Sequence, residues 1–209
     1  MIFDSDGTLV DSLKLIVSAY NYAVEPAMHK TFSDTYVSSL FGPTMEKIFT
    51  ETLPSKYVAE AILRYHQYYL EHFHDHAKVY PEIPELIKSL HGTRSLGVLT
   101  GAGRMAATLT LQQSGLADYF QIVVTGDDTH RPKPDPEGLR LTIAKMSAAP
   151  QSTVYIGDSR IDIEAAKGAG ILSGGALWGS KQPSELAASN PDFLFQKPSE
   201  VLKAISYYS

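Results

Sequence analysis

Two aspartates, Asp4 and Asp6, stand two residues apart directly after the apolar pair Ile2 and Phe3, and Gly7 then permits a sharp turn. In a strand, side chains at positions i and i+2 point to the same side, so both carboxylates can face one substrate. One carboxylate can then attack phosphorus and form an aspartyl-phosphate, while the other protonates the leaving oxygen and later takes a proton from water. The spacing therefore predicts a carboxylate pair for phosphoryl chemistry and leaves open which aspartate has which role.

Further polar groups follow later apolar runs, at the points where strands would end. They are Thr100 and Gly101 after residues 96–99, Lys133 beyond residues 122–124, and Asp158, Ser159 and Asp162 after residues 154–156. In an open parallel sheet, ligands bind beyond the carboxyl ends of the strands. If these runs are neighbouring strands, carboxylates, a hydroxyl and a lysine meet at one edge of the sheet.

The chemistry of such an edge favours phosphoryl transfer. Four clustered aspartates repel one another, and the ammonium of Lys133 alone cannot neutralise them. A hard divalent cation could, and Mg²⁺ prefers carboxylate oxygens, retained waters and substrate phosphate. Thr100 and the Gly101 amide can donate hydrogen bonds to an anion, and Lys133 adds a positive charge from a loop stiffened by prolines. The residues alone thus indicate a Mg²⁺-dependent site in which positioning and charge stabilisation do most of the work.

The elements that must position these groups alternate along the chain. From residue 79 onward, short apolar runs are separated by segments with helical periodicity that end in glycine or proline. This alternation is typical of βαβ units and predicts an α/β fold with a parallel sheet and helices on both faces. The expected strands are residues 2–3, 96–99, 122–124, 154–156, 171–177 and 193–195.

The segment between the first strand and residue 79 has a different pattern. Its apolar residues recur at helical spacing in three stripes, around residues 13–24, 45–49 and 62–73, and it carries no strand signal. Pro43 suits the first position of the second of these helices. We therefore expect a helical domain of residues 13–78, inserted into a core that residues 1–12 and 79–209 form.

Composition and charge limit the partners and the compartment. The 209 residues suit one domain with an insert, and 18 Lys and Arg against 23 Asp and Glu leave a net charge of −5, which argues against nucleic acid or an anionic membrane. The absence of cysteine excludes disulfides, thiolate metal sites and a cysteine nucleophile. No apolar run approaches the roughly 18 residues of a membrane helix, and the start does not resemble a signal peptide. We expect a cytoplasmic protein, a monomer by default.

Residues 4–12, DSDGTLVDS, resemble the first motif of the haloacid dehalogenase superfamily. Thr100, Lys133 and residues 157–162, GDSRID, stand where its second, third and fourth motifs would fall, in order and at suitable spacing. The resemblance covers essentially the whole chain and implies a Rossmann-like core with a small helical cap between the first two motifs. Residues 41–43, 126–128 and 176–179 are most similar to the subgroup of phosphoglycolate phosphatases and bacterial inorganic pyrophosphatases.

The resemblance also implies a role for each matching residue, with Asp4 as the nucleophile and Asp6 as the general acid and base. The implied Mg²⁺ ligands are the Asp4 carboxylate, the Asp158 carboxylate and the backbone carbonyl of Asp6, supported by Ser159 and Asp162. The implied phosphate ligands are Thr100, the Gly101 amide and Lys133. Because members with other chemistries lack a second acid at position 6, Asp6 favours hydrolysis of a phosphate ester or anhydride. The implied activity is that of a phosphatase acting on a small phosphorylated metabolite, phosphoglycolate-like or pyrophosphate.

Three features depart from the superfamily pattern. Ser5 replaces a bulky apolar residue, and Gly101 stands where asparagine is common. Only three residues precede Asp4, which leaves open whether the natural chain begins upstream of Met1.

Two other functions remain open. One is phosphoryl transfer between sugar positions, as in β-phosphoglucomutase, which would require a long-lived aspartyl-phosphate. The other is a phospho-ligand binding module without turnover, although the presence of Asp4 and Asp158 argues against it. A phospho-acceptor signalling domain is excluded because its acceptor aspartate lies mid-chain. Neither the substrate nor the roles of individual cap residues can be inferred from the sequence.

Two further groups of residues have ordinary structural explanations. The histidines at positions 66, 72, 74 and 76 include an i,i+4 pair, yet without a nearby acid signature of a zinc site we expect solvated histidines at helix ends. The tyrosines at positions 65, 68 and 69 are expected to pack within the cap. Trp178 could equally contact substrate or cover the edge of the core.

Overall fold

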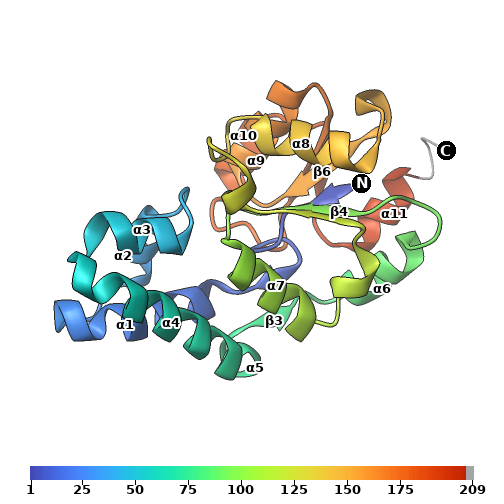
Figure 1. The fold of residues 1–209 in the computed structure, drawn as a ribbon. Helices are drawn as coiled ribbons and strands as arrows, with labels where there is room; N and C mark the ends of the chain where they lie inside the picture. Colours follow the sequence, from blue (N-terminus) through green and yellow to red (C-terminus); the bar gives the residue numbers. More distant parts are fainter. Residues whose placement is uncertain (206–209) are drawn as a thin grey trace.

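The computed structural model describes residues 1–205 and contains a six-stranded parallel sheet (Figure 1). The strand order is β5-β4-β1-β6-β7-β8. The strands are β1 (Ile2–Phe3), β4 (Gly97–Leu99), β5 (Ile122–Val124), β6 (Val154–Gly157), β7 (Leu172–Ala176) and β8 (Phe193–Phe195). Each lies within one of the runs expected from the sequence or extends it by one residue, and the predicted α/β fold with a parallel sheet is confirmed.

The shortest strand, β1, lies in the middle of the sheet. Ile2 pairs with Gly97 of β4 on one side and with Tyr155 of β6 on the other. Ile2 and Phe3 have no exposed surface, because their side chains alternate between the two covered faces. Residues that follow β1 are therefore placed between those that follow β4 and β6.

Helices cover both faces of the sheet. The side of Ile2 carries α8 (Glu137–Met146) and α9 (Arg160–Ala169), and α10 (Pro183–Ala188) packs beside α9. The side of Phe3 carries α6 (Ile83–Leu90), α7 (Arg104–Gln113) and α11 (Ser199–Ile205). Three short 3₁₀ helices join these elements, namely Ala117–Tyr119, Gly126–Asp128 and Pro150–Ser152.

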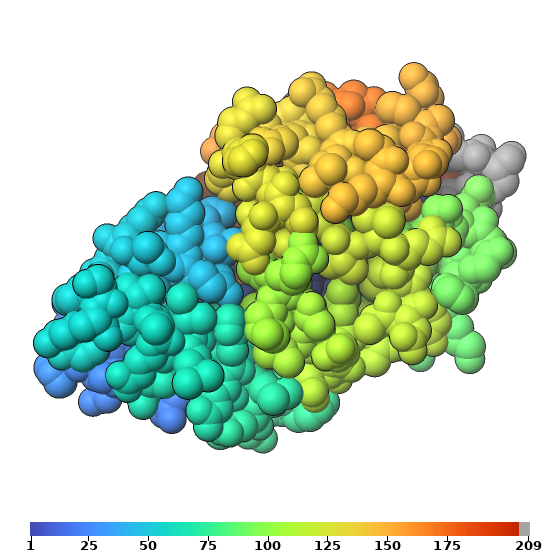
Figure 2. All heavy atoms as spheres, in the orientation of Figure 1, coloured from blue at the N-terminus to red at the C-terminus, as the bar shows by residue number. Residues whose placement is uncertain are grey.

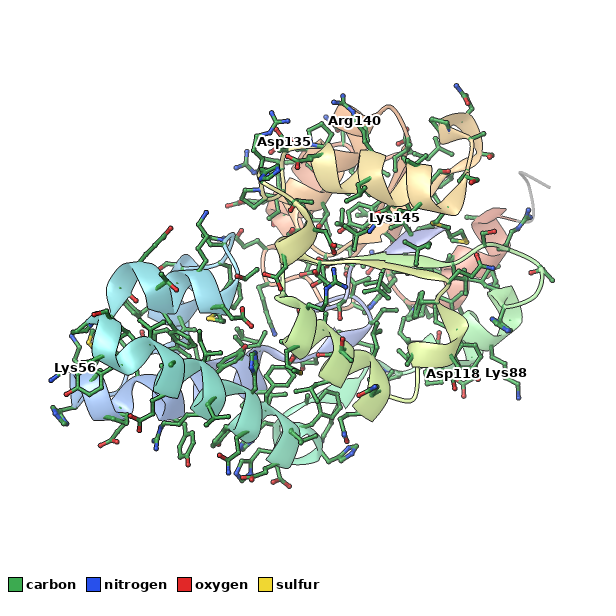
Figure 3. All side chains as sticks on the ribbon, in the orientation of Figure 1. Lys56, Lys88, Asp118, Asp135, Arg140 and Lys145 are labelled. Carbon is green, nitrogen blue, oxygen red and sulfur yellow. The ribbon has the colours of Figure 1, made fainter. Side chains whose placement is uncertain are left out.

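Five helices separate the first strand from the rest of the core, and we call them the cap helices. They are α1 (Leu13–Met28), α2 (Asp34–Ser39), α3 (Met45–Thr52), α4 (Ser55–Glu71) and α5 (Phe73–His76). Figure 1 shows them gathered to one side of the sheet, and Lys56 lies at their outer end in Figure 3. The helices agree with the expected insert except at its end, where Lys78 lies in a strand, while the division of the insert from the core as a separate domain stays a prediction.

The chain enters and leaves the cap helices through a small antiparallel pair that the sequence did not predict. Strand β2 (Val10–Asp11) pairs with β3 (Lys78–Val79), with Val10 opposite Val79. Each strand is only two residues long, which is too short to give a recognisable alternation of apolar and polar residues. The pair brings the two connections between cap and core side by side.

The expected position of Pro43 at the start of a helix was wrong. Thr44 is the N-cap of α3, and its hydroxyl accepts a hydrogen bond from the Lys47 amide at 3.4 Å. Threonine is a good N-cap because its oxygen satisfies an amide of the first turn, so the helix begins one residue later, at Met45. No helix in the part of the chain that the structure describes is long and apolar enough to cross a membrane.

An arginine on α4 compensates for a proline inside α1. Pro26 has no amide hydrogen, so the Tyr22 carbonyl one turn earlier lacks its helical partner. Arg64 donates to this carbonyl from Nε at 3.0 Å and Nη2 at 2.8 Å, and its guanidinium lies 4.0 Å from the Tyr22 ring centroid. This contact joins the two longest cap helices.

We expect the change Arg64→Met to lower the free energy of unfolding by about 1 kcal/mol, because it leaves the carbonyl without a donor and removes a cation–π contact. Urea denaturation at neutral pH measures the loss. A double-mutant cycle with Pro26→Ala provides the control, since an alanine amide at position 26 can pair with the Tyr22 carbonyl. An equal loss in both backgrounds would contradict this explanation.

Candidate active site

Asp4 lies at the carboxyl end of the central strand and is almost fully buried. Its amide donates to the Ile156 carbonyl at 2.8 Å and so continues the pairing of β1 with β6. Its Oδ1 accepts a hydrogen bond from the Ser5 amide at 2.8 Å, and its Oδ2 accepts one from Lys133 Nζ at 2.7 Å. The carboxylate is thus held in one orientation at the sheet edge predicted from the sequence.

Lys133, which lies in the loop after β5, joins a group that follows β1 to groups in and after β6. Its ammonium donates to Asp4 Oδ2 and Asp162 Oδ1, each at 2.7 Å, and to the Tyr155 hydroxyl at 3.0 Å. An ammonium has three hydrogens, so these contacts use all of its donors. The two carboxylates hold the pKa of Lys133 well above its usual value despite burial, and the lysine therefore carries a full charge.

Hydrogen bonds within the loop hold the backbone on both sides of Lys133. The Glu137 carboxylate accepts hydrogen bonds from the amides of His130 at 3.0 Å and Arg131 at 3.2 Å. Arg131 also forms an ion pair of 2.9 Å with Asp135, which lies near the start of α8 in Figure 3. The loop is thereby folded so that the lysine side chain points inward.

Asp162 fixes both a helix and the lysine. One of its oxygens accepts hydrogen bonds from the amide and hydroxyl of Ser159, which caps the start of α9. The other accepts from Lys133 and from the Tyr155 hydroxyl, the latter at 3.0 Å. Asp162 has no exposed surface, and its two oxygens are already occupied by these donors. This arrangement suits a supporting role.

Tyr155 belongs to this cluster, although the sequence analysis did not single it out. It stands within the apolar run of β6, where a tyrosine counts as a core residue. Its hydroxyl oxygen also lies 3.2 Å from the Leu99 carbonyl oxygen, a second acceptor for its one hydrogen. Its place inside an apolar run was the sequence signal that could have identified it, since a tyrosine hydroxyl buried there needs polar partners.

Asp6 lies beside the cluster and is bound by hydroxyl groups. Ser12 donates to its Oδ1, and Thr100 lies 3.5 Å from its Oδ2. The Thr100 oxygen in turn accepts a hydrogen bond from the Ala102 amide at 3.1 Å. Burial raises the pKa of Asp6, while the Ser12 hydroxyl and Lys133 act in the opposite direction. A raised pKa suits a carboxyl that must give and take a proton.

Gly7, in the turn after β1, makes room for the Asp158 carboxylate. Gly7 has a positive φ of 79°, and a Cβ there would lie 2.5 Å from Asp158 Oδ2. Thr8 donates to the other oxygen of Asp158 at 3.1 Å. The glycine after the two aspartates is therefore required both by its backbone conformation and by the carboxylate packed against it.

The acidic cluster has the charge and spacing that a metal ion requires. Asp4, Asp158 and Asp162 each offer an oxygen, and these oxygens lie within 4.8 Å of one another. Burial raises the pKa of Asp4 to about 7 despite the opposing charge of Lys133. Burial and the charges of the two other aspartates raise the pKa of Asp158. One ammonium among these buried carboxylates leaves negative charge uncompensated, so the residues fit a divalent cation.

The site opens into a cavity of about 790 Å³ between the cap helices and the core. Asp4, Asp6, Thr100, Gly101 and Lys133 line its core side. In Figure 2 the blue and cyan atoms of the cap meet the yellow and green atoms of the core along this boundary. The expected phosphate-binding residues therefore face one space together with both aspartates of the first motif.

Trp178 packs against the loop that follows β1. Its indole Nε1 donates to the Thr8 carbonyl at 2.9 Å, and the neighbouring Gly179 lies so close to the Gly7 carbonyl that a Cβ there would collide with it. Trp178 is not among the residues that line this cavity. Of its two expected roles, the contacts support covering the edge of the core.

The cap histidines have protein partners. His72 pairs with Asp75 at 3.2 Å, and His76 Nε2 lies 3.2 Å from the Tyr68 hydroxyl. Among the described residues, the group with metal-ligand spacing consists of aspartates alone. The tyrosines pack as expected, since the rings of Tyr65 and Tyr69 are buried and lie 5.7 Å apart.

A family model matches most of the chain, and relatives of known name match almost all of it. A family model described as "Haloacid dehalogenase-like hydrolase" matches residues 1–176. The chain is 30% identical over 207 residues to the pyrophosphatase PpaX of Listeria innocua, covering 98% of this chain and 95% of that one. It is 31% identical over 206 residues to PpaX of Bacillus velezensis, covering 97% and 94%.

Solved structures have the same fold. The crystal structure of a predicted phosphoglycolate phosphatase from Haemophilus somnus is similar with a TM-score of 0.84 and 24% identity, covering 97% of this chain and 96% of that one. A hydrolase from Pseudomonas syringae is similar with a TM-score of 0.78 and 24% identity, covering 100% and 98%. At this level of identity, the structural similarity shows the fold alone.

Proposed function

This chain belongs to the haloacid dehalogenase-like hydrolase family and is a phosphatase of that family, and we propose that it hydrolyses a small phosphorylated metabolite with Mg²⁺ through an aspartyl-phosphate. One observation carries the proposal. The Asp4 carboxylate stands at the end of the central strand with Lys133 bound to one oxygen and with Asp6 and Thr100 facing the same cavity. A nucleophile, an acid and phosphate-binding donors thus surround one space.

The reaction has two steps that balance through the same pair of aspartates. In the first, an Asp4 oxygen attacks phosphorus, the bond from phosphorus to the leaving oxygen breaks, and Asp6 gives that oxygen a proton. In the second, water attacks phosphorus, Asp6 takes a proton from the water, and the bond to Asp4 breaks to release phosphate. Thr100 and the Gly101 amide would hold the phosphoryl oxygens in both steps, and the ammonium of Lys133 would place a positive charge beside them.

The groups that would hold Mg²⁺ are the carboxylates of Asp4 and Asp158 and the backbone carbonyl of Asp6. Ser159 and Asp162 would support these ligands from nearby. The bound ion supplies positive charge against the phosphoryl oxygens. Asp162 orients Lys133 and completes the capping box of α9, because its oxygens accept hydrogen bonds from Lys133 and from the N-cap residue Ser159.

The cap would contribute the remaining walls of the site. We propose residues 13–78 as a cap over a core of residues 1–12 and 79–209, joined by the paired strands β2 and β3. Closure of such a cap would exclude water and place cap side chains against the part of the substrate that is not phosphate. The pyrophosphatase name of the relatives makes pyrophosphate a candidate substrate, beside phosphoglycolate and other small phosphate esters.

Phosphate release from a panel of compounds, with Mg²⁺ or with a chelator, tests the proposal. We expect release with Mg²⁺ and background rates with the chelator, because the aspartate cluster lacks compensation without the ion. The panel contains pyrophosphate, phosphoglycolate, sugar phosphates, nucleotides and p-nitrophenyl phosphate.

A second readout does not depend on turnover. Mg²⁺ should raise the thermal unfolding temperature of the wild-type protein, since an ion that binds only the folded state stabilises it. Isomerisation of a sugar phosphate without net phosphate release would favour a phosphotransferase. Release that is equal in the chelator would contradict the role of the metal.

A further inference from the structure

The cap helices contribute a largely apolar buried wall to the cavity of about 790 Å³ beside Asp4 and Asp6, which we call the central cavity. Among the described residues, the buried side chains that the cap helices place on this wall are Ile16, Met45 and Tyr65. The half-buried acid on the same wall, Glu46, is enclosed by protein, since one oxygen pairs with His66 at 2.8 Å and the other is buried against Gly103. The polar group within the buried wall is therefore the hydroxyl of Tyr65.

Packing fixes the ring of Tyr65. Its centroid lies 5.8 Å from that of Phe49 on α3 and 5.7 Å from that of Tyr69 on the same helix, and only 3% of the residue is exposed. The ring has little freedom to move, so its hydroxyl is held at one place on the wall. A group held in this way can bind a ligand without the cost of being ordered first.

The hydroxyl of Tyr65 has no hydrogen-bond partner among the described residues. The side-chain atoms of these residues that are both unpartnered and completely buried are Ser5 Oγ, Glu46 Oε2 and His76 Nδ1. The Tyr65 hydroxyl is not one of them, so it keeps exposed surface, and the space that Tyr65 lines is the central cavity. Tyr69, one turn later on α4, differs in this respect, because its hydroxyl meets that of Thr110 at 2.8 Å.

This hydroxyl adds nothing to the packing of the cap that a phenylalanine would not supply. Burial is the main cause that raises the pKa of Tyr65 well above its usual value, and the charges of Tyr69, Asp6 and Glu46 add to it, so the hydroxyl keeps its proton and can donate. A ligand oxygen placed against the hydroxyl would pair with it, whereas a hydrocarbon group would leave it without an acceptor, which is unfavourable.

We propose that Tyr65 determines the substrate class by donating a hydrogen bond to an oxygen atom of the leaving group. This inference rests on the proposed function, which places the phosphoryl group at Asp4 and Thr100 and the rest of the substrate against the cap. The preferred substrates are then phosphate monoesters of small oxygenated alcohols, which offer a short carbon chain to the apolar wall and an acceptor to the hydroxyl. Hydroxyl and carboxylate oxygens both accept, so Tyr65 selects oxygen over hydrocarbon rather than one charge over another.

Two pairs of esters with matched carbon chains test this class. Phosphoglycolate is compared with ethyl phosphate, and glycerol 3-phosphate is compared with propyl phosphate. For the wild-type protein in Mg²⁺, we expect kcat/KM to be higher by about tenfold or more for the oxygen-bearing member of each pair, since a site built to bind a substrate oxygen rejects an analogue that lacks it.

The variant Tyr65→Phe removes the hydroxyl and keeps the ring. We expect kcat/KM to fall about tenfold for phosphoglycolate and glycerol 3-phosphate and to stay within about twofold for ethyl and propyl phosphate. The unfolding temperature should stay the same or rise, because no hydrogen bond within the protein is lost. Tyr69→Phe is the matched control on the same helix. It loses the contact with Thr110, so its unfolding temperature should fall while all four values of kcat/KM stay unchanged.

The outcomes distinguish this inference from the proposed function. Absence of a wild-type preference within the pairs, an unchanged rate on the oxygen-bearing esters in Tyr65→Phe, or an equal loss on all four esters would overturn the role of Tyr65 while the phosphatase activity stands. Hydrolysis of pyrophosphate or p-nitrophenyl phosphate but of none of the four esters would overturn it as well. If no compound releases phosphate in Mg²⁺, the proposed function fails and this inference falls with it.

Discussion

Replacing Asp4 with asparagine is expected to lower kcat by about 10⁴-fold or more on every substrate, because the amide cannot form the bond to phosphorus. The change is nearly isosteric, and the remaining partners of Lys133, Asp162 and Tyr155, keep the lysine in place. It also removes one of the crowded carboxylates, so the fold should be retained. The loss should therefore appear in turnover and not in stability.

Phosphate release at saturating substrate, together with thermal unfolding, measures this prediction. Asp118→Asn is the matched control, since Asp118 is exposed and lies far from the cap–core boundary in Figure 3. The control should have wild-type kinetics. Activity of Asp4→Asn within tenfold of wild type would remove Asp4 as the nucleophile.

The position of Asp4 was predictable because topology constrains it strongly. Apolar runs mark where the strands end, and in a parallel sheet those ends share one edge. The groups that follow β1, β4 and β6 therefore had to lie close together, even though β1 contains only two residues. Four short runs of sequence were enough to predict which side chains would face one another.

The contacts of Tyr155 and Glu46 were not predictable in this way. The Tyr155 hydroxyl meets Leu99, Lys133 and Asp162, which come from three separate parts of the chain. Glu46 lies beside Gly103 because the cap helices pack on the core, and neither residue spacing nor periodicity reports that packing. Local patterns specify elements, whereas contacts between distant elements depend on how those elements are assembled.

The two aspartates of the first motif also differ in surroundings that spacing alone did not reveal. Asp4 contacts the ammonium of Lys133, whereas Asp6 is bound by the hydroxyls of Ser12 and Thr100. Burial raises the pKa of both carboxyls, but the ammonium beside Asp4 favours its anion, whereas the neutral hydroxyls around Asp6 can hydrogen-bond either protonation state. These surroundings support the assignment of the nucleophile to Asp4 and of proton transfer to Asp6.

The change Asp6→Asn should therefore act through proton transfer, and its effect should depend on the leaving group. For an alkyl phosphate, whose leaving oxygen needs a proton, we expect kcat to fall by about 10²–10⁴-fold. For p-nitrophenyl phosphate the first step needs little help, because nitrophenolate leaves without a proton. The second step still lacks its base, so Asp4 should remain phosphorylated.

Acid quenching followed by intact-protein mass spectrometry measures this intermediate. We expect phosphorylated protein to accumulate in Asp6→Asn with p-nitrophenyl phosphate and to stay at a low level with an alkyl phosphate, where the first step is slow. The double variant Asp4→Asn, Asp6→Asn should carry no phosphate, which ties the signal to Asp4. Equal losses of kcat on both substrates, without accumulation of phosphorylated protein, would show that Asp6 positions the substrate and does not transfer protons. Only a proton-transfer role makes the two steps respond differently to the leaving group.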